Sequence, residues 1–200
     1  MSRSTLALVR HGRTEWNRLG LLQGRSDIPL DEVGQEQARA VAAMLADEEW
    51  DTVITSTAAR AVGTGRIIAA HLGVSTAAPL PALVERSYGA AEGLSRSDAA
   101  ARWPDGRYPD LESLAAVAKR GRRALDSIVA AHPSCRIVVV AHGALIRAVL
   151  DDLSGEPAPR ILNGAVSEIE WSQGWAVRSV NRTPGPPPSP RTSGRLSEAR

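Results

Sequence analysis

The sequence has little cysteine and no long apolar stretch. Cys135 is the single cysteine among 200 residues, so there is no pair for a disulfide and no cysteine cluster for a metal ion. We expect this thiol to be inert. No apolar run approaches the roughly 20 residues that a membrane-spanning helix needs, and the N-terminus lacks the apolar core of a secretion signal. We therefore expect a cytoplasmic protein that makes no contact with membranes.

The chain also carries little net charge. Its formal charge is +2 at pH 7, but residues 182–200 hold four arginines against one glutamate, so residues 1–181 carry −1 by the same count. This balance offers no basic globular surface for nucleic acid. The last residues are rich in Pro, Gly, Ser and Arg, which bury too little apolar surface to offset the entropy lost on ordering. We expect one domain over residues 1–181 and a disordered tail over 182–200.

What the sequence does contain is a pair of apolar strands that each end in histidine. Residues 6–9 are an unbroken apolar run, typical of a strand buried on both faces, and Arg10 and His11 follow it. Residues 136–141 form the clearest buried strand, and His142 follows directly. Ligands of open α/β sheets bind beyond the carboxyl ends of the strands. If these two strands are neighbours, the two imidazoles converge at one edge of the sheet.

Strand and helix patterns alternate along the rest of the chain. Asp31 is a good N-cap for a helix, and residues 52–55 are β-branched and typical of a strand. Ser56 and Thr57 would cap the next helix, which runs to about His71. Further strands are expected at 74–80, 165–171 and 175–180, further helices at 97–103, 111–131 and 144–153, and loops at 12–30 and 83–93. This alternation predicts an α/β fold, a mostly parallel sheet with helices on both faces.

Arg60 lies in the first turns of the helix that follows residues 52–55. Free backbone N–H groups and the helix dipole both favour an anion at that place, so Arg60 is a candidate phosphate ligand. Gly63 and Gly65 interrupt the same helix, and each costs about 1 kcal/mol relative to alanine. We expect close packing against the sheet to be the reason for them.

These residues belong to a longer series of motifs. The series comprises Arg10-His11-Gly12 with Thr14, Asn17, Gln23-Gly24, Asp27, Pro29-Leu30 and Gly34; residues 56–61 with Thr64; Leu83–Arg86 with Tyr88-Gly89 and Glu92-Gly93; and His142-Gly143. Over roughly residues 5–155 it resembles the histidine phosphatase superfamily, the phosphoglycerate mutase-like enzymes. Gly65 replaces the family's usual alanine. Glu112-Ser113 and Arg120 resemble a further motif, to which we give little weight because Leu111 stands where a glycine is expected.

The resemblance implies a site that transfers a phosphoryl group. His11 would be the nucleophile that forms a phosphohistidine, and the neighbouring arginines would lower its pKa. Arg10 and Arg60 would bind the phosphoryl oxygens, His142 would donate to them, and Glu85 would be the general acid. The implied substrate-binding residues are Asn17, Gln23, Gly24 and Tyr88.

Three other titratable residues are assigned no part in catalysis. We interpret Glu92 as a solvated loop carboxylate, and His71 and His132 as structural residues near helix ends. We expect no metal ion and no other cofactor, because two arginines neutralise the phosphate dianion. The expected partner is a small phosphorylated substrate rather than nucleic acid, and the oligomeric state is left open, with a dimer as one option.

Three functions fit the motifs. They are hydrolysis of phosphate monoesters by an acid-type histidine phosphatase, cofactor-dependent phosphoglycerate mutase activity, and phosphate-ligand binding without catalysis. A pure binder could lack His11 or Glu85, and both are present. Mutases of the family generally carry a long insertion between the acid and the second histidine, whereas Glu85 and His142 lie only 57 positions apart. This spacing favours hydrolysis, although Tyr88 and Arg96 stand where the mutases have a substrate-binding tyrosine and lysine.

Overall fold

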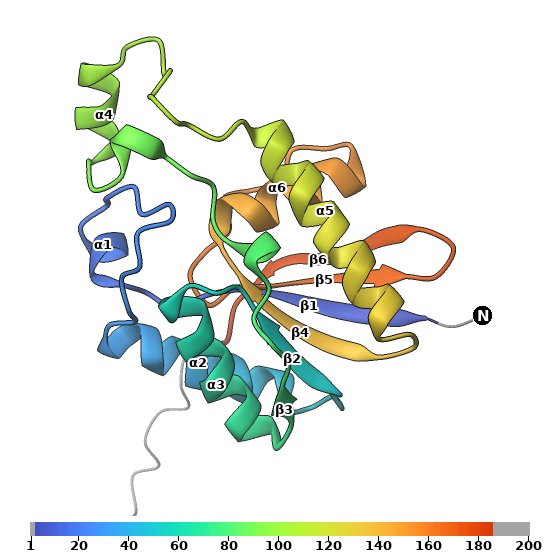
Figure 1. Ribbon diagram of the computed structural model, residues 1–200. Coiled ribbons are helices and arrows are strands. Elements are labelled where there is room, and N and C mark those ends of the chain that lie inside the picture. Colours follow the sequence, from blue (N-terminus) through green and yellow to red (C-terminus); the bar gives the residue numbers. More distant parts are fainter. Residues whose placement is uncertain (1–2, 186–200) are drawn as a thin grey trace, which may run out of the picture.

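A computed structural model describes residues 3–185, so most of the tail expected over 182–200 lies outside the described residues. The fold is built on one six-stranded sheet with the order β3-β2-β4-β1-β5-β6 (Figure 1). The strands are β1 Ser4–Arg10, β2 Thr52–Thr55, β3 Ser75–Thr76, β4 Arg136–Ala141, β5 Val166–Trp171 and β6 Trp175–Arg182. The helices are α1 Glu15–Arg18, α2 Glu32–Leu45, α3 Ala59–Leu72, α4 Arg96–Arg102, α5 Leu114–Ala131 and α6 Gly143–Ser154, with short 3-10 turns η1 Pro81–Leu83 and η2 Gly89–Ala91.

The sheet is mostly parallel, as the sequence predicts. Strand β4 lies between β1 and β2 and is parallel to both, and β3 continues this direction at one edge. The hairpin of β5 and β6 is antiparallel and joins the other side of β1. The carboxyl ends of β1, β2 and β4 therefore meet at the same edge of the sheet.

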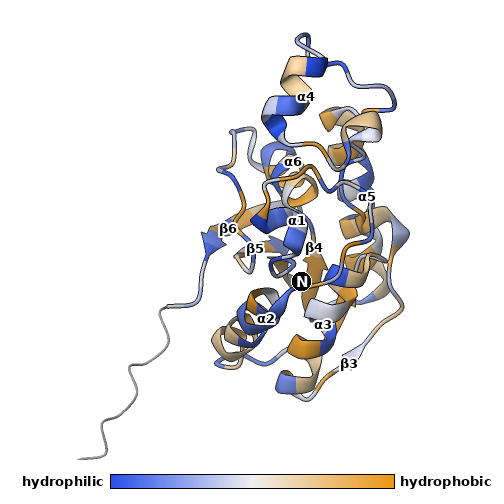
Figure 2. Ribbon diagram, turned by 90° about the vertical axis from the view of Figure 1, so that its left-hand side faces the viewer, coloured by the Kyte–Doolittle hydropathy of each residue, from blue (hydrophilic) through white to orange (hydrophobic). Residues whose placement is uncertain are grey.

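Helices cover both faces of the sheet, which confirms the predicted architecture. Leu6 and Leu8 of β1 pack into the core beneath α5 and α6. Ala7 and Val9 point to the opposite face, where they pack into the core beneath α2 and α3. Figure 2 shows the apolar residues gathered along the strands and on one side of α2. Because successive strand residues face opposite sides, a strand buried on both faces needs the unbroken apolar run seen here.

The N-cap of α2 agrees with the sequence prediction, and that of α3 differs from it. Asp31 caps α2 by accepting a hydrogen bond of 2.7 Å from the Gly34 N–H. The prediction that Ser56 and Thr57 cap α3 is wrong, because this helix has no side-chain cap of its own. Asp27 of the preceding loop instead accepts a 2.7 Å bond from the N–H of Ala59, the first residue of α3. The loop and the helix are thereby tied together.

Gly65 of α3 packs closely against the sheet, as expected, whereas Gly63 packs against Leu30 of the loop before α2. A Cβ atom on Gly65 would lie 2.3 Å from the Thr55 Cγ2 atom of β2. A Cβ on Gly63 would lie 3.3 Å from a methyl group of Leu30. The two glycines lower the intrinsic helix propensity of α3 and allow the helix that carries Arg60 to pack closely against its neighbours.

The largest departures from the predicted elements are in α1, α5 and β3. The expected loop 12–30 contains α1, which is four residues long and capped by Thr14. Helix α5 begins at Leu114 rather than 111, because Ser113 is its N-cap. The expected edge strand at 74–80 has only two residues in β3.

Residues 86–113 form a small lobe with its own core. Leu22, Ala91 and Ala99 are buried in it, and Tyr88, Leu94, Trp103 and Tyr108 pack around them. In Figure 1 this lobe, which carries α4, projects past the sheet beside α1. Within residues 3–185, no helix combines the length and the apolar character needed to span a bilayer.

Candidate active site

The two strand-terminal histidines meet at the carboxyl edge of the sheet. Strands β1 and β4 pair in parallel with Arg10 opposite Ala141, so His11 and His142 leave the sheet side by side. Their ring centroids are 5.2 Å apart and their planes are inclined at 60°. Both side chains are buried, with 3% and 0% of their surfaces exposed. The convergence expected from the two strand ends is present.

His11 has the geometry of a nucleophile. Its Nδ1 atom lies 2.7 Å from the carbonyl oxygen of Gly12, and because a carbonyl only accepts, Nδ1 carries the proton and Nε2 keeps its lone pair. Burial lowers the pKa of His11 well below 6.5, and the charges of Arg10 and Arg60 lower it further. Desolvation is thus a larger cause than the arginines to which the sequence analysis attributes the shift. The imidazole is neutral at physiological pH.

Gly12 is required where the chain turns away from the sheet. A Cβ atom at this position would lie 2.1 Å from the Gly34 carbonyl oxygen, so no side chain fits there. The Gly12 N–H donates to the Thr64 hydroxyl at 3.1 Å, and that hydroxyl donates to the Arg60 carbonyl at 2.8 Å. The nucleophile and the second arginine are therefore held by one short chain of contacts.

Arg60 is buried and Arg10 is partly buried, and each keeps a free donor. Arg10 donates one Nη to the Ile161 carbonyl at 2.7 Å. Arg60 donates to the carbonyls of Gly24 and Ser26, both at 2.8 Å, and only 1% of its surface is exposed. Burial lowers the pKa of Arg10 to about 10 and lowers that of Arg60. The Nε atom of each is buried without a partner among the described residues, which is costly unless an anion binds there.

His142 is oriented by Ser56. The Ser56 hydroxyl lies 2.6 Å from His142 Nε2, whereas Nδ1 is buried and has no partner in the described part of the chain. If Ser56 donates, the ring proton is on Nδ1, which is then free to donate to a bound anion. Burial lowers the pKa of His142 well below 6.5, and His11 adds to this effect. Ser56, expected to be a helix cap, supports the second histidine instead.

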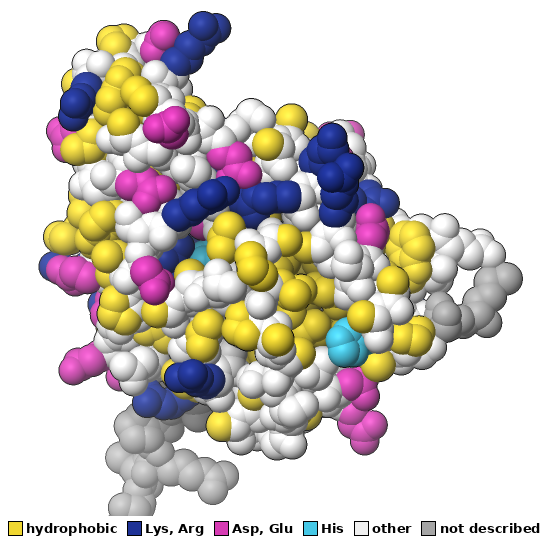
Figure 3. All heavy atoms as spheres, in the orientation of Figure 1, with side chains coloured by type: hydrophobic (Ala, Val, Ile, Leu, Met, Phe, Trp, Pro, Cys, Tyr) yellow, Lys and Arg dark blue, Asp and Glu magenta, His cyan; other side chains and the backbone are white. Residues whose placement is uncertain are grey.

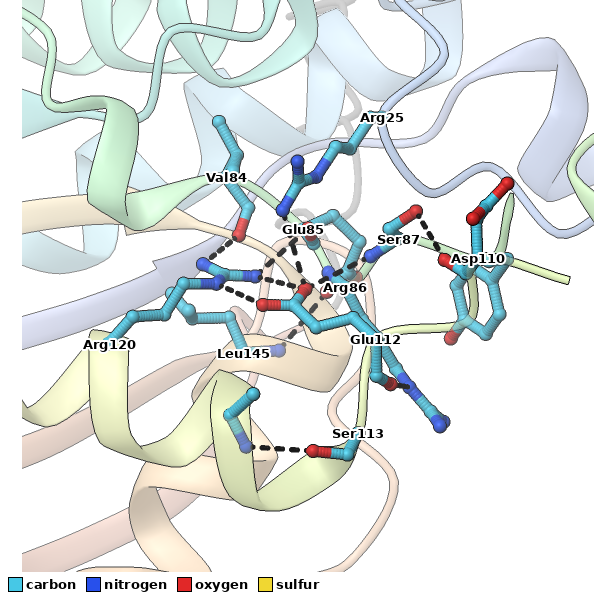
Figure 4. Close-up of polar contacts among 12 residues, drawn as sticks. Arg25, Val84, Glu85, Arg86, Ser87, Asp110, Glu112, Ser113, Arg120 and Leu145 are labelled. Atoms are coloured by element: carbon cyan, nitrogen blue, oxygen red, sulfur yellow. Dashed lines mark hydrogen bonds and ion pairs between the residues drawn. The ribbon is translucent and has the colours of Figure 1, made fainter.

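Glu85 lies against the first turn of α6, which follows His142. Its Oε1 atom accepts from the Leu145 N–H at 3.1 Å and from the Arg86 N–H at 2.8 Å, and Oε2 accepts from the Ala144 N–H at 3.1 Å (Figure 4). The same helix start therefore positions both Glu85 and His142. Oε2 has a single donor, so it is the oxygen with room for a proton.

An ion pair between Arg120 of α5 and Glu112, just before that helix, holds the segment that carries Glu85. Arg120 bonds both oxygens of Glu112, and it also donates to the carbonyls of Val84 and Glu85 at 2.6 and 3.0 Å (Figure 4). Burial acts to raise the pKa of Glu112, but bonds from Arg120 and Ser87 keep it below its ordinary value. The motif that received little weight in the sequence analysis is thus part of the support of this site.

Glu92 is not the solvated carboxylate that the sequence analysis expects. It accepts from the backbone N–H groups of Arg25 and Ser26 at 2.9 Å, from the Ser26 hydroxyl at 2.6 Å, and from the Tyr88 N–H at 3.2 Å. Arg25 and Ser26 lie in the loop whose carbonyls bind Arg60, and Tyr88 lies three residues after Glu85. Glu92 therefore joins that loop to the segment that carries Glu85.

A cavity of about 560 Å³ opens in front of these residues. Its walls include all the sequence-predicted site residues except His142, namely Arg10, His11, Asn17, Gln23, Gly24, Arg60, Glu85 and Tyr88. His142 lies buried beside His11. Figure 3 shows basic side chains gathered across the face between α4 and the sheet. Among residues 3–185, no three His, Cys, Asp or Glu side chains form a group that could hold a metal ion.

Three residues that line the cavity have a role, or a place in the site, that the sequence does not predict. The side-chain oxygen of Gln23 accepts hydrogen bonds from the Thr14 hydroxyl at 3.0 Å and the Asn17 amide at 3.3 Å. Gln23 therefore stabilises the loop. Asn163 was missed: its Nδ2 donates to Asn17 at 3.0 Å and to the His11 carbonyl at 3.1 Å. Arg160 also lines the cavity and was missed. Both missed residues follow α6 in a stretch that has no motif.

Comparisons with known proteins find relatives over almost the whole chain. The sequence profile of the histidine phosphatase superfamily, branch 1, matches residues 6–183. The chain is 36% identical to an uncharacterized phosphatase, PhoE, of Bacillus subtilis, covering 89% of this chain and 94% of that protein. It is 31% identical to a probable phosphoglycerate mutase, GpmB, of Yersinia enterocolitica, covering 88% and 92%. A mycobacterial glucosyl-3-phosphoglycerate phosphatase superposes with a TM-score of 0.82 at 25% identity, covering 90% of this chain and all of that one.

Proposed function

This chain belongs to the histidine phosphatase superfamily, branch 1, and from that premise we propose that it hydrolyses phosphate monoesters through a phosphohistidine at His11. The proposal includes an acid-type mechanism on a small phosphorylated metabolite. The observation that carries it is a neutral, buried imidazole that shares one cavity with Arg10 and Arg60. The Nε atom of each arginine is buried and has no partner among the described residues.

In the first step the lone pair of His11 Nε2 attacks phosphorus, and the bond from phosphorus to the ester oxygen breaks. Arg10 and Arg60 bind the phosphoryl oxygens and offset the charge that opposes attack. His142 donates from Nδ1 as charge shifts onto those oxygens. Glu85 enters protonated on Oε2 and gives this proton to the departing oxygen, which leaves as an alcohol.

In the second step water hydrolyses the phosphohistidine. The Glu85 carboxylate takes a proton from the water, the water oxygen bonds to phosphorus, and the bond between phosphorus and His11 Nε2 breaks. Inorganic phosphate leaves, and Glu85 is again protonated. Each residue thus returns to its starting state, and the balanced reaction consumes one ester and one water.

The direct test is release of inorganic phosphate from p-nitrophenyl phosphate by the full chain. We expect steady turnover that His11→Gln abolishes. Thr57→Ala, an exposed neighbour of the site, serves as a control and should keep wild-type turnover. Absence of phosphate release from this ester and from a panel of phosphorylated metabolites would contradict the proposal.

Phosphoglycerate mutase activity is the second candidate. Tyr88 and Arg96 line the cavity, and GpmB is among the similar proteins. A mutase must keep water away from the phosphoenzyme until the second transfer. Only 57 positions separate Glu85 from His142, and residues 86–113 among them are packed around a small core. This leaves little chain for a lid that would exclude water, which supports hydrolysis. Supplying 3-phosphoglycerate with catalytic 2,3-bisphosphoglycerate decides between them: isomerisation much faster than phosphate release from any metabolite would favour the mutase.

A further inference from the structure

A second cavity of about 280 Å³ continues from the phosphate site. It shares five wall residues with the larger cavity, namely Arg10, Glu85, Tyr88, Arg96 and Arg160, but His11 does not line it. It then extends along the first turns of α6. Because Glu85 is the group proposed to protonate the departing oxygen, a space that contacts Glu85 and not His11 is where the leaving group of an ester would lie.

The walls of this second cavity are strongly basic. Besides Arg10, they contain Arg86, Arg96, Arg147 and Arg160, against the two carboxylates of Glu85 and Asp151. Arg96, Arg147 and Arg160 come from α4, α6 and the loop after α6. In the described range 3–185, none of the three guanidinium groups forms a hydrogen bond or ion pair with another residue. Single exposed arginines are commonly solvated, but here three converge on one space from separate parts of the chain.

The two carboxylates of the cavity form no ion pair with Arg96, Arg147 or Arg160 among residues 3–185. Both oxygens of Glu85 accept from backbone N–H groups, and Asp151 accepts a 2.6 Å bond from the Ala158 N–H. Arg160 is close enough to Arg10 for its charge to contribute to the lowered pKa of Arg10. An additional anion in this space would therefore meet several uncommitted guanidinium groups, which favour bidentate binding of carboxylates and phosphates.

We propose that this second cavity binds an anionic group, a carboxylate or a second phosphate, carried by the leaving group of the substrate. The inference rests on the proposed function and specifies its substrate class: small phosphate monoesters of acidic alcohols. A volume of about 280 Å³ equals that of about nine water molecules, enough for a compact hydroxy acid. Arg147 and Arg160 determine specificity, and Arg10 links the two anion sites.

The test compares matched esters with the full wild-type chain at low ionic strength. Glycerol 3-phosphate has a neutral leaving group, 3-phosphoglycerate replaces its terminal alcohol with a carboxylate, and propane-1,3-diol bisphosphate carries a second phosphate. We expect kcat/KM for at least one anionic ester to exceed that for glycerol 3-phosphate by tenfold or more. The advantage should shrink in high salt, which screens exposed charges. The two anionic arms identify which group is preferred.

A double variant, Arg147→Gln with Arg160→Gln, locates the preference. The ratio of kcat/KM between the preferred anionic ester and glycerol 3-phosphate should fall at least tenfold. Arg39→Gln, an exposed arginine of α2, should leave this ratio unchanged. Both arginines of the double variant are exposed, and its thermal midpoint can be checked against wild type.

The outcomes separate this inference from the proposed function. If wild type hydrolyses p-nitrophenyl phosphate but handles the neutral and anionic esters equally, the inference is wrong and the proposed function stands. A wild-type ratio in the double variant would also overturn it. If no ester, including p-nitrophenyl phosphate, is hydrolysed, the proposed function itself fails.

Discussion

Arg120 and Glu112 form a two-point ion pair, with Nε 2.7 Å from Oε1 and Nη2 3.0 Å from Oε2. The side chains are only 20% and 14% exposed. The remaining donors of Arg120 reach the backbone carbonyls of Val84 and Glu85. This pair therefore fixes the backbone on which the proposed general acid is mounted, and Arg120 acts as a positioning residue.

Arg120→Gln should impair hydrolysis of poor leaving groups far more than of good ones. An alkyl alcohol must be protonated as it leaves, whereas p-nitrophenolate needs little help, so a displaced Glu85 affects the alkyl ester selectively. We expect kcat/KM for an alkyl phosphate to fall about 10²-fold and stability to fall by about 1.5–3 kcal/mol. Steady-state kinetics and urea unfolding measure the two effects.

The matched control for this variant is Arg123→Gln, an exposed arginine on the same helix, which should behave as wild type. Glu85→Gln should show the same selective loss of activity on alkyl esters. Its stability should stay near that of wild type, because the contacts of Arg120 remain. Equal losses on alkyl and aryl esters in Arg120→Gln would indicate a structural role alone.

Ser56→Ala should lower kcat by about fivefold. The hydroxyl of Ser56 holds His142 Nε2 at 2.6 Å, and losing one hydrogen bond of this kind is worth about 1 kcal/mol. Without it, His142 is free to adopt the other tautomer and to turn. Thr57→Ala is the neighbouring control, because its side chain is exposed. Unchanged turnover in Ser56→Ala would show that His142 does not depend on this contact.

The fall of kcat/KM on the acid side of the pH profile should lie below pH 6.5. Burial lowers the pKa values of His11 and His142 well below that ordinary value, so the nucleophile stays neutral as the pH falls through 6.5. We expect kcat/KM to remain free of a histidine-like transition near pH 6.5. A half-maximal kcat/KM near pH 6.5 in wild type, at a pH distinct from the second ionisation of the phosphate ester itself, would contradict the lowered pKa values.

The same shifts make stability depend on pH with a definite sign. Below pH 6.5 the unfolded chain binds protons at His11 and His142 that the folded chain does not, so stability falls as the pH falls. This contribution is fully present above pH 6.5 and is lost progressively below it. Urea unfolding between about pH 5 and 8 should give a shallower acid slope for His142→Asn than for wild type. Identical slopes would show that the buried imidazole carries no such linkage.

Activity should survive removal of divalent metals and should be blocked by vanadate. The charge of the phosphoryl group is offset by Arg10 and Arg60, and vanadate mimics the five-coordinate phosphorus that these arginines would bind. Phosphate release is measured after exhaustive EDTA dialysis, and again with added vanadate. Loss of activity in EDTA that a divalent cation restores would contradict a mechanism based on the arginines.

The sequence predicts those parts of this protein that depend on local patterns. The strands of β1 and β4 are recognisable because each is an unbroken apolar run, and Asp31 is recognisable as a cap from its position before an amphipathic helix. The pairing of these strands then brings His11 and His142 together. Helix α1, with four residues, is too short to have a periodic pattern.

Contacts between distant segments could not be predicted in this way. Glu92 resembles a loop carboxylate because its partners, Arg25 and Ser26, lie 67 and 66 positions earlier. Ser56 resembles a helix cap because its partner, His142, lies 86 positions later. Arg160 reaches the site from a loop whose sequence carries no pattern. Only the tertiary structure assigns such residues to the site.

The covalent intermediate at His11 tests the account most directly. The chain is mixed with a phosphate monoester labelled with ³²P, quenched within milliseconds in alkaline detergent, since phosphohistidine hydrolyses in acid, and digested for peptide mapping. We predict a label that is stable in base and labile in acid on the peptide containing His11, absent from His11→Gln. Label on the peptide containing His142, or turnover with no labelled histidine at any time point, would contradict the proposed mechanism.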